Sequence, residues 1–178
     1  MEILRRDQAG KRWKQHWAQM HEEWFKLEVL QSYAGEDDRP SLRAYLAGNP
    51  TRGRALLEQE AQTSAWRDAC QQKQCEGVTL RRIRILETPY TPYTKWELEH
   101  YRLINKPGGE QIFFIDKDKT EDLDLPAGDL MIFDNRNVVV NAYDGAMRME
   151  QQAFYTEEDD ITGFLALKDY LLRIAKPL

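Results

Sequence analysis

Residues 78–86, VTLRRIRIL, decide how the second half of this chain folds, because their polar and apolar side chains alternate. An alternation with a period of two predicts a β-strand with two different faces. Arg82 and Arg84 share one face of this strand. Ile83 and Ile85 lie on the opposite face.

The residues after this strand predict a short helix, three further strands and a closing helix. TPYTKWELEHYRL (residues 91–103) is typical of a helix that follows Pro92. Residues 156–178 predict the closing helix, whose first turn is rich in acids, as the helix dipole favours. The predicted strands are QIFFID (111–116), DLMIFD (129–134) and NVVVNAYD (137–144).

The residues before Val78 predict helices. Apolar residues recur at steps of four and three, which predicts one amphipathic helix from Gly10 to Tyr33. Residues 41–50 predict a short helix, and residues 53–76 a longer one that stops at Gly77. The apolar stripe of the first helix consists of Trp13, Trp17, Met20, Trp24 and Leu27.

Together these elements predict an α/β or α+β fold. A helical N-terminal half, residues 1–77, is followed in residues 78–178 by a mixed sheet with flanking helices and a closing C-terminal helix. We expect both regions to pack together as one domain, since the chain has 178 residues.

Composition excludes several classes of function. The net charge of −5 opposes direct binding of nucleic acid, which draws on clustered positive charge. We expect a cytoplasmic protein without a membrane partner, because the sequence has no apolar run that could span a bilayer and no signal-like N-terminus. Cys70 and Cys75 match neither a redox pair nor a zinc site, and the three histidines are not spaced as metal ligands. We therefore expect neither a metal nor a cofactor.

Two arginines on one strand face, followed by a helix with Trp96 and Glu97, predict a polar pocket. Arg82 and Arg84 can converge on one carboxylate or phosphate, because the guanidinium fork suits both anions. The alternative is that both arginines only pair with nearby carboxylates and cover the sheet, with Glu97, Glu99 and Glu110 as the partners. The candidate ligand-binding residues are Arg82, Arg84, Trp96, Glu97, Tyr101 and Asp134.

Glu97 and Glu110 are the candidate catalytic residues. If burial desolvates Glu97, its raised pKa suits a general base. If an arginine is its counter-ion, the pKa falls and Glu97 becomes a poor base.

Four segments resemble an uncharacterised actinobacterial family, a domain of unknown function that is often encoded beside helix-turn-helix regulators. They are RRIRILETPYTPYTKWELEHY (81–101), PGGEQIFFID (107–116), DLMIFDNRNVVVNAYDG (129–145) and IAKPL (174–178). The resemblance implies an outline but no activity. The positions that it marks are Arg82, Arg84, Pro89, Trp96, Glu97, Gly109, Glu110, Phe133, Asp134 and Tyr143.

The second half of the chain is also similar to a degenerate half of a phospholipase-D-like fold. That family carries a catalytic His-x-Lys and a following Asp on a strand and turn. Asp134 matches the Asp, whereas Ala127 and Asp129 stand at the positions of the His and the Lys. The resemblance therefore implies that phosphodiester chemistry has been lost.

These observations support two hypotheses. In the first, the chain is a non-catalytic regulatory or interaction module that binds a partner protein, a DNA-binding regulator, and a small anionic ligand. In the second, it is a small enzyme of specialised metabolism that acts on an amino-acid-like or phosphate-bearing substrate. A glutamate would then act as acid and base, and the arginines would clamp the anion.

Overall fold

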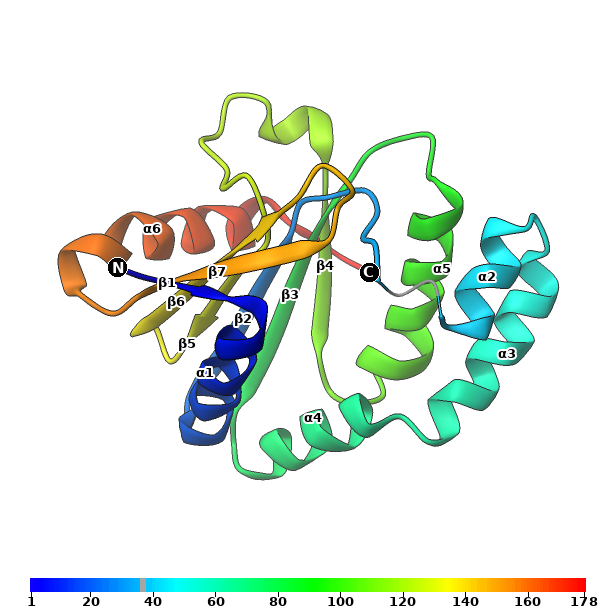
Figure 1. Cartoon of the computed structure of the whole chain (residues 1–178), viewed down its shortest axis with the longest axis horizontal. Coiled ribbons are helices and arrows are strands. Elements are labelled where there is room, and N and C mark those ends of the chain that lie inside the picture. Colours follow the sequence, from blue (N-terminus) through cyan, green and yellow to red (C-terminus); the bar gives the residue numbers. More distant parts are fainter. Residues whose placement is uncertain (36–37) are drawn as a thin grey trace.

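The computed structural model describes residues 1–35 and 38–178 and places an eight-stranded sheet at the centre of the molecule (Figure 1). The order across the sheet is β1-β7-β6-β5-β2-β3-β4-β8. The strands β2, β3 and β4 are parallel neighbours, and the other neighbouring pairs are antiparallel. The strands are β1 (Glu2–Arg5), β2 (Glu23–Glu28), β3 (Thr79–Leu86), β4 (Gln111–Asp116), β5 (Leu130–Phe133), β6 (Asn137–Tyr143), β7 (Met149–Tyr155) and β8 (Lys176–Pro177).

Helices flank this sheet, and the last of them closes the chain, so the predicted mixed α/β class is confirmed. None of the helices formed by the described residues has the length and apolar character needed to cross a membrane. The α-helices are α1 (Arg6–Gln19), α2 (Pro40–Leu46), α3 (Pro50–Gln62), α4 (Ala65–Cys75), α5 (Pro92–His100) and α6 (Glu158–Ile174). A π-helical segment, η1 (Tyr101–Asn105), extends α5, and a 3₁₀ turn, η2 (Lys117–Thr120), follows β4.

One face of the sheet is apolar and packs against α6. Ile83 and Ile85 of β3 lie on this face, as the alternation in the sequence predicted. They join Phe25 and Leu27 of β2 and Leu171 of α6 in one buried cluster. Burying this apolar area supplies a large part of the driving force for folding.

The opposite face changes character along β2 and β3. Near their amino ends, Trp24 and Leu80 pack in an apolar cluster with Trp13 and Trp17 of α1. Toward their carboxyl ends, the side chains on this face become charged while remaining largely buried. The charged residues are Lys26, Glu28, Arg82 and Arg84.

The predicted helix from Gly10 to Tyr33 is wrong in its second half. The helix α1 ends at Gln19, and residues 23–28 form β2 instead. Trp24 fits the helical spacing in the sequence, but it lies on β2 and contacts the same apolar cluster from the sheet side. Its ring packs edge-on against that of Trp17, with the ring centroids 5.7 Å apart. The pairing of β2 with β3 and β5 outweighs the local helical pattern.

The predicted helix over residues 53–76 is two helices. The break falls at Thr63, and Ser64 begins α4 by accepting a hydrogen bond from the backbone of Arg67. The strands β1, β7 and β8 were not predicted. Since β1 and β2 lie within residues 1–77, this range contributes strands as well as helices, while the division into two regions of one domain stays a prediction.

Candidate functional site

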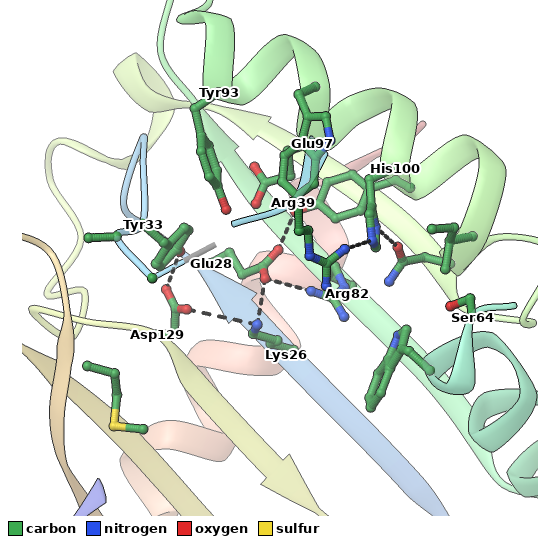
Figure 2. Close-up of a pocket in the computed structure, with 18 of the residues that line it drawn as sticks. Lys26, Glu28, Tyr33, Arg39, Ser64, Arg82, Tyr93, Glu97, His100 and Asp129 are labelled. Atoms are coloured by element: carbon green, nitrogen blue, oxygen red, sulfur yellow. Dashed lines mark hydrogen bonds and ion pairs between the residues drawn. The ribbon is translucent and has the colours of Figure 1, made fainter. Parts of the chain in front are cut away.

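A pocket of about 1010 Å³ lies on the polar face of the sheet, between the carboxyl ends of β2 and β3, the start of β5 and helix α5 (Figure 2). Lys26, Glu28 and Arg82 project into it from the strands, and Asp129 lies just before β5. In an open sheet, ligands commonly bind outside the carboxyl ends of parallel strands, so this position is favourable for a site. The wall residues include Tyr33, Arg39, Tyr93, Trp96, Glu97, His100, Tyr101 and Tyr143.

Arg82 is the centre of a buried ion-pair network. Its Nε donates to Glu110 Oε2 at 2.7 Å, and its Nη1 donates to Glu28 Oε1 at 2.6 Å. Its guanidinium lies 5.4 Å from the ring centroid of Trp24 and 5.5 Å from that of Tyr101. Although burial opposes the charge, the two carboxylates raise the pKa of Arg82 well above its ordinary value. The side chain is therefore fixed and permanently cationic.

Glu110, a candidate catalytic residue, lies behind Arg82 rather than in the pocket. Its Oε1 accepts hydrogen bonds from Trp66 Nε1 and Asn105 Nδ2, both at 2.6 Å, and its Oε2 accepts from Arg82. The side chain is 0% exposed. With both oxygens engaged, Glu110 acts as a counter-ion and has no access to a substrate.

Glu28 binds the second cation of the pocket floor. Lys26 Nζ lies 2.5 Å from Glu28 Oε1, the same oxygen that Arg82 binds, and the Tyr101 hydroxyl donates to Glu28 Oε2. Burial acts to raise the pKa of Glu28, but Arg82 and Lys26 outweigh it and hold the pKa below the ordinary range. Glu28 therefore stays ionised and aligns the two cations side by side.

Glu97 lies on α5 and forms the upper part of the pocket wall (Figure 2). Arg84 Nε donates to Glu97 Oε2 at 2.6 Å. Burial raises the pKa of Glu97 to about 8, with Arg84 opposing the shift and Glu28 adding to it. Arg84 lies next to the lining residues, with its guanidinium 5.6 Å from the ring centroid of Tyr33. Its two terminal nitrogens have no hydrogen-bond partner among the residues that the structure describes.

The structure thus shows the carboxylate pairs that the second alternative expects of the arginines. Arg82 and Arg84 lie on one strand face, but each binds carboxylates instead of converging on a shared free space. The partners include Glu97 and Glu110, as that alternative proposed, and also Glu28. Glu99 instead pairs with Arg54 and Arg102 near the surface.

Asp129 is held by two tyrosines at the side of the pocket. Its Oδ1 accepts from the Tyr33 hydroxyl at 2.5 Å and from the Val29 amide at 3.2 Å. Its Oδ2 accepts from the Tyr143 hydroxyl at 2.8 Å, and Lys26 Nζ is 4.0 Å away. Burial is the main cause of the raised pKa of Asp129.

His100 and Trp96 are fixed by hydrogen bonds at the far side of the pocket. Arg39 Nη1 lies 2.9 Å from His100 Nε2, and Asn105 Oδ1 lies 2.8 Å from His100 Nδ1. Because arginine only donates, Nε2 accepts and Nδ1 carries the proton. Burial, aided by Arg39, lowers the pKa of His100 to about 4, so the ring is neutral at neutral pH. Trp96 Nε1 donates to Ser41 Oγ at 2.9 Å.

Arg84, described above, is one of two predicted ligand-binding residues outside the pocket lining, and the other is Asp134. It lies in the turn after β5, outside the set of residues that line the pocket. Its carboxylate accepts hydrogen bonds from the backbone amides of His21, Glu22 and Glu23 at 2.7 to 3.0 Å. Asp134 therefore binds the backbone amides at the start of β2, which is a structural role. Of the other predicted ligand-binding residues, Arg82, Trp96, Glu97 and Tyr101 line the pocket.

The sequence missed Lys26, Glu28 and Tyr33 as pocket residues. Their signal was the alternation in EWFKLE, residues 23–28, which the predicted helix concealed. The resemblance did mark Tyr143, which the structure places beside Asp129.

The described residues hold no cluster of three or more His, Cys, Asp or Glu side chains arranged for a metal ion. Cys70 is buried and Cys75 exposed, and neither forms a disulfide. Burial and Glu110 raise the pKa of the Cys70 thiol well above its ordinary value, which makes this thiol unreactive.

Two solved structures share the fold at low sequence identity. Nuc from Salmonella typhimurium, a phospholipase D family member, is 9% identical with a TM-score of 0.57, and the match covers 99% of this chain and 96% of that chain. NucT from Helicobacter pylori is 10% identical with a TM-score of 0.54, covering 99% and 98%. The archaeal chromatin protein TrmBL2 is 13% identical with a TM-score of 0.49, and the match covers 99% of this chain but 54% of that chain. The likeness to Nuc confirms the resemblance to a phospholipase-D-like protein for the fold, and it extends over nearly the whole chain rather than the second half alone.

No protein with a curated description matches the chain. The family described as Domain of unknown function (DUF6879) matches residues 11–178, and the chain therefore belongs to this family.

Proposed function

We propose that the chain is a non-catalytic regulatory module that binds a small molecule in the pocket and transmits its occupancy to a partner protein. The observation that carries this proposal is a cavity of about 1010 Å³ with aromatic walls and a fixed charged floor. Ligand sites are typically concave and largely apolar, with a few polar groups that fix orientation. Burying so many charges is costly, and ion pairs of this kind are weak evidence for stability. Ligand binding would explain why these charges are buried beside the pocket.

Two features support a role without catalysis. The positions that match the catalytic His and Lys of the phospholipase-D-like motif are Ala127 and Asp129. Asp129 has both oxygens engaged by Tyr33, Tyr143 and the backbone of Val29. A carboxylate bound in this way is an anchor for the pocket wall and a poor nucleophile.

The partner protein in this proposal is a DNA-binding regulator. Its support is the resemblance of the sequence to a family encoded beside helix-turn-helix regulators, which is an argument by association. Helix α2 offers a route between pocket and surface, since Pro40 lines the pocket at its start and Leu46 is half exposed at its end. A ligand that contacts the start of α2 can therefore shift this helix and change the shape of the surface around Leu46.

The proposed ligand is still a small molecule with an anionic group, but a different residue contacts this group. Arg82 and Arg84 each bind a carboxylate, and their side chains are 7% and 0% exposed. We therefore assign the first contact to Lys26, a cation of the pocket lining whose side chain is 20% exposed. A ligand carboxylate or phosphate would approach this ammonium.

A thermal-shift screen against a library of small metabolites tests the proposal. A binder should raise the melting temperature of the wild-type protein. The shift should fall in a Trp96→Ala variant and persist in a Tyr170→Ala variant, since Tyr170 lies on α6 outside the pocket. A library without a binder, or binders that ignore Trp96, would refute ligand binding in this pocket. Affinity purification from cells that express the protein natively tests the partner, and recovery of the chain alone as a monomer would refute it.

The small enzyme is a second candidate, which one observation favours. Glu97 lines the pocket, and its pKa of about 8 is close to the value that suits a general acid or base at neutral pH. Mass spectrometry of a binder after incubation with the protein distinguishes the two functions. Conversion by the wild type and none by Glu97→Gln would favour the enzyme, and unchanged binder would favour the non-catalytic module.

A further inference from the structure

Glu97 presents one engaged and one open carboxyl oxygen. Arg84 takes Oε2. Oε1 forms no hydrogen bond to any residue in the described part of the chain, and the residue lines the pocket. In the ionised form of Glu97 this oxygen is an acceptor for a donor group of a ligand, and a cationic donor favours that form over the protonated one.

Lys26 and Arg82 present open donors on the floor of the same pocket. The Lys26 ammonium has three N–H bonds. One goes to Glu28 Oε1 at 2.5 Å, and Asp129 Oδ2, at 4.0 Å, is beyond hydrogen-bonding distance. Arg82 uses Nε and Nη1, while its Nη2 has no hydrogen-bond partner among the described residues. Since Lys26 and Arg82 both contact the same oxygen of Glu28, their side chains end close together, and these open donors can hold the two oxygens of one carboxylate.

The balance of charge argues against a ligand that is only an anion. Among the described residues of this network, three groups are cationic and four are carboxyls. With all four carboxyls ionised, a further negative charge would add to their excess. The ammonium of a zwitterion offsets the charge of its own carboxylate, and beside Glu97 it favours the ionised form of that residue over the protonated one. The cations are Lys26, Arg82 and Arg84, and the carboxyls are Glu28, Glu97, Glu110 and Asp129.

The aromatic walls leave room for a side chain. Tyr93 and Trp96 stand next to Glu97 on α5, with ring centroids 5.4 Å apart, and Tyr33 packs 5.8 Å from Tyr93. Such walls suit an apolar or planar group and also favour a nearby ammonium.

We propose that the ligand is an amino-acid-like zwitterion, whose carboxylate binds between Lys26 and Arg82 and whose ammonium binds Glu97 Oε1. This inference rests on the proposed function and names its ligand class. It uses Glu97 Oε1, Arg82 Nη2 and the open N–H bonds of Lys26, all of which belong to residues that line the pocket. The terminal nitrogens of Arg84 are not among its contacts, because Arg84 lies outside the lining residues. It also accounts for the coexistence of buried cations and an excess of carboxyls in one pocket.

The test compares one ligand with two neutralised derivatives. The twenty L-amino acids are first screened by thermal shift, and the strongest binder is titrated calorimetrically beside its carboxamide and its N-acetyl form. The carboxamide lacks the anionic group and the N-acetyl form lacks the cationic one. We expect both derivatives to bind at least tenfold more weakly. Equal binding of either derivative, or no binding by any of the twenty, would overturn the zwitterion.

Two variants assign each half of the ligand to a residue. Lys26→Met should abolish the preference for the amino acid over its carboxamide and keep the preference over the N-acetyl form. Glu97→Gln should do the reverse. Lys95→Met and Glu99→Gln, at neighbouring positions on α5 outside the pocket lining, should change neither preference. If the preferences of the two pocket variants are exchanged or unchanged, the assignment is wrong. The comparison in the wild type decides the ligand class even if a variant does not fold.

The outcome also separates this inference from the proposed function. If the metabolite screen yields pocket binders but no amino acid binds, only the zwitterion fails. If nothing binds in the pocket, both fail.

Discussion

The two faces of the sheet are built in opposite ways from the same strands. Residues 25, 27, 83 and 85 turn aliphatic and aromatic side chains to α6, and their neighbours at 26, 28, 82 and 84 turn charges to α5. Both faces are buried. The apolar face needs only complementary shape, whereas the charged face needs a partner for each group it buries. The comparison teaches that the first face gains stability from burial alone, whereas the second is stable only while each buried charge keeps its partner.

The largest expected effect comes from removing one partner on the charged face. Arg82→Ala leaves Glu28 and Glu110 buried without their shared cation, which should cost about 4 kcal/mol of the free energy of unfolding. Urea denaturation measures this loss. A cost below about 1 kcal/mol would mean that the network is not buried as described.

A truncation on the apolar face should cost somewhat less and spare binding. Leu171 is 0% exposed, and Leu171→Ala should destabilise the protein by about 3 kcal/mol through the cavity that it leaves. Ligand affinity, measured at a temperature where the variant is folded, should be unchanged. An affinity that falls together with stability would contradict the separation of the two faces.

The pH dependence of stability should identify Glu97. Its folded-state pKa of about 8 exceeds that of an unfolded glutamate, so the folded state binds the extra proton between the two values. The stability that this group contributes is complete below about pH 4.5 and should be lost at about 1.4 kcal/mol per pH unit as the pH rises from about 5 to about 8. Arg84 opposes this proton and Glu28 favours it, whereas Lys26 and Arg82 oppose it.

The measurement is the difference between the wild type and Glu97→Gln across this pH range. Subtracting the variant cancels the contributions of other groups. If the difference in the free energy of unfolding between the two proteins does not change with pH, Arg84 keeps Glu97 ionised throughout this range.

The smallest effect is expected at the exposed end of the same helix. Glu99 pairs with Arg54 and Arg102 at the surface, and surface pairs contribute little. Glu99→Gln should change the free energy of unfolding by less than about 0.5 kcal/mol. A larger loss would show that a charge on α5 matters wherever it lies, which would weaken the case for the pocket.

The fold could be predicted where the signal is local. The alternation in β3 and the runs that form β4, β5 and β6 were sufficient, as were the helical patterns of α5 and α6. The strand β2 was missed because its tryptophan continued the spacing of α1, and only its pairing with β3 and β5 defines it. The strands β1 and β7 pair with each other at one edge, and β8 has two residues, so their local signals are weak.

The site could be predicted only in part, for a related reason. Arg82, Trp96 and Glu97 lie within 16 residues of sequence, and the local pattern brought them together. The register that sets Lys26 beside Arg82 joins segments far apart in the chain, which no local pattern encodes. The same limit applies to Asp134, because the backbone amides that it binds belong to residues 21–23, which are 111 to 113 residues away in the chain.

The most direct test of the central claim is a nuclear magnetic resonance titration with a binder from the metabolite screen, observed at the five tryptophan indole N–H groups. Trp96 and Trp66 line the pocket and donate to Ser41 and Glu110, so their signals should shift on binding, together with that of Trp24. Methyl signals of Ile83 and Leu171 on the α6 face should stay in place. Shifts confined to the α6 face, or spread evenly over both faces, would contradict a ligand site on the charged face.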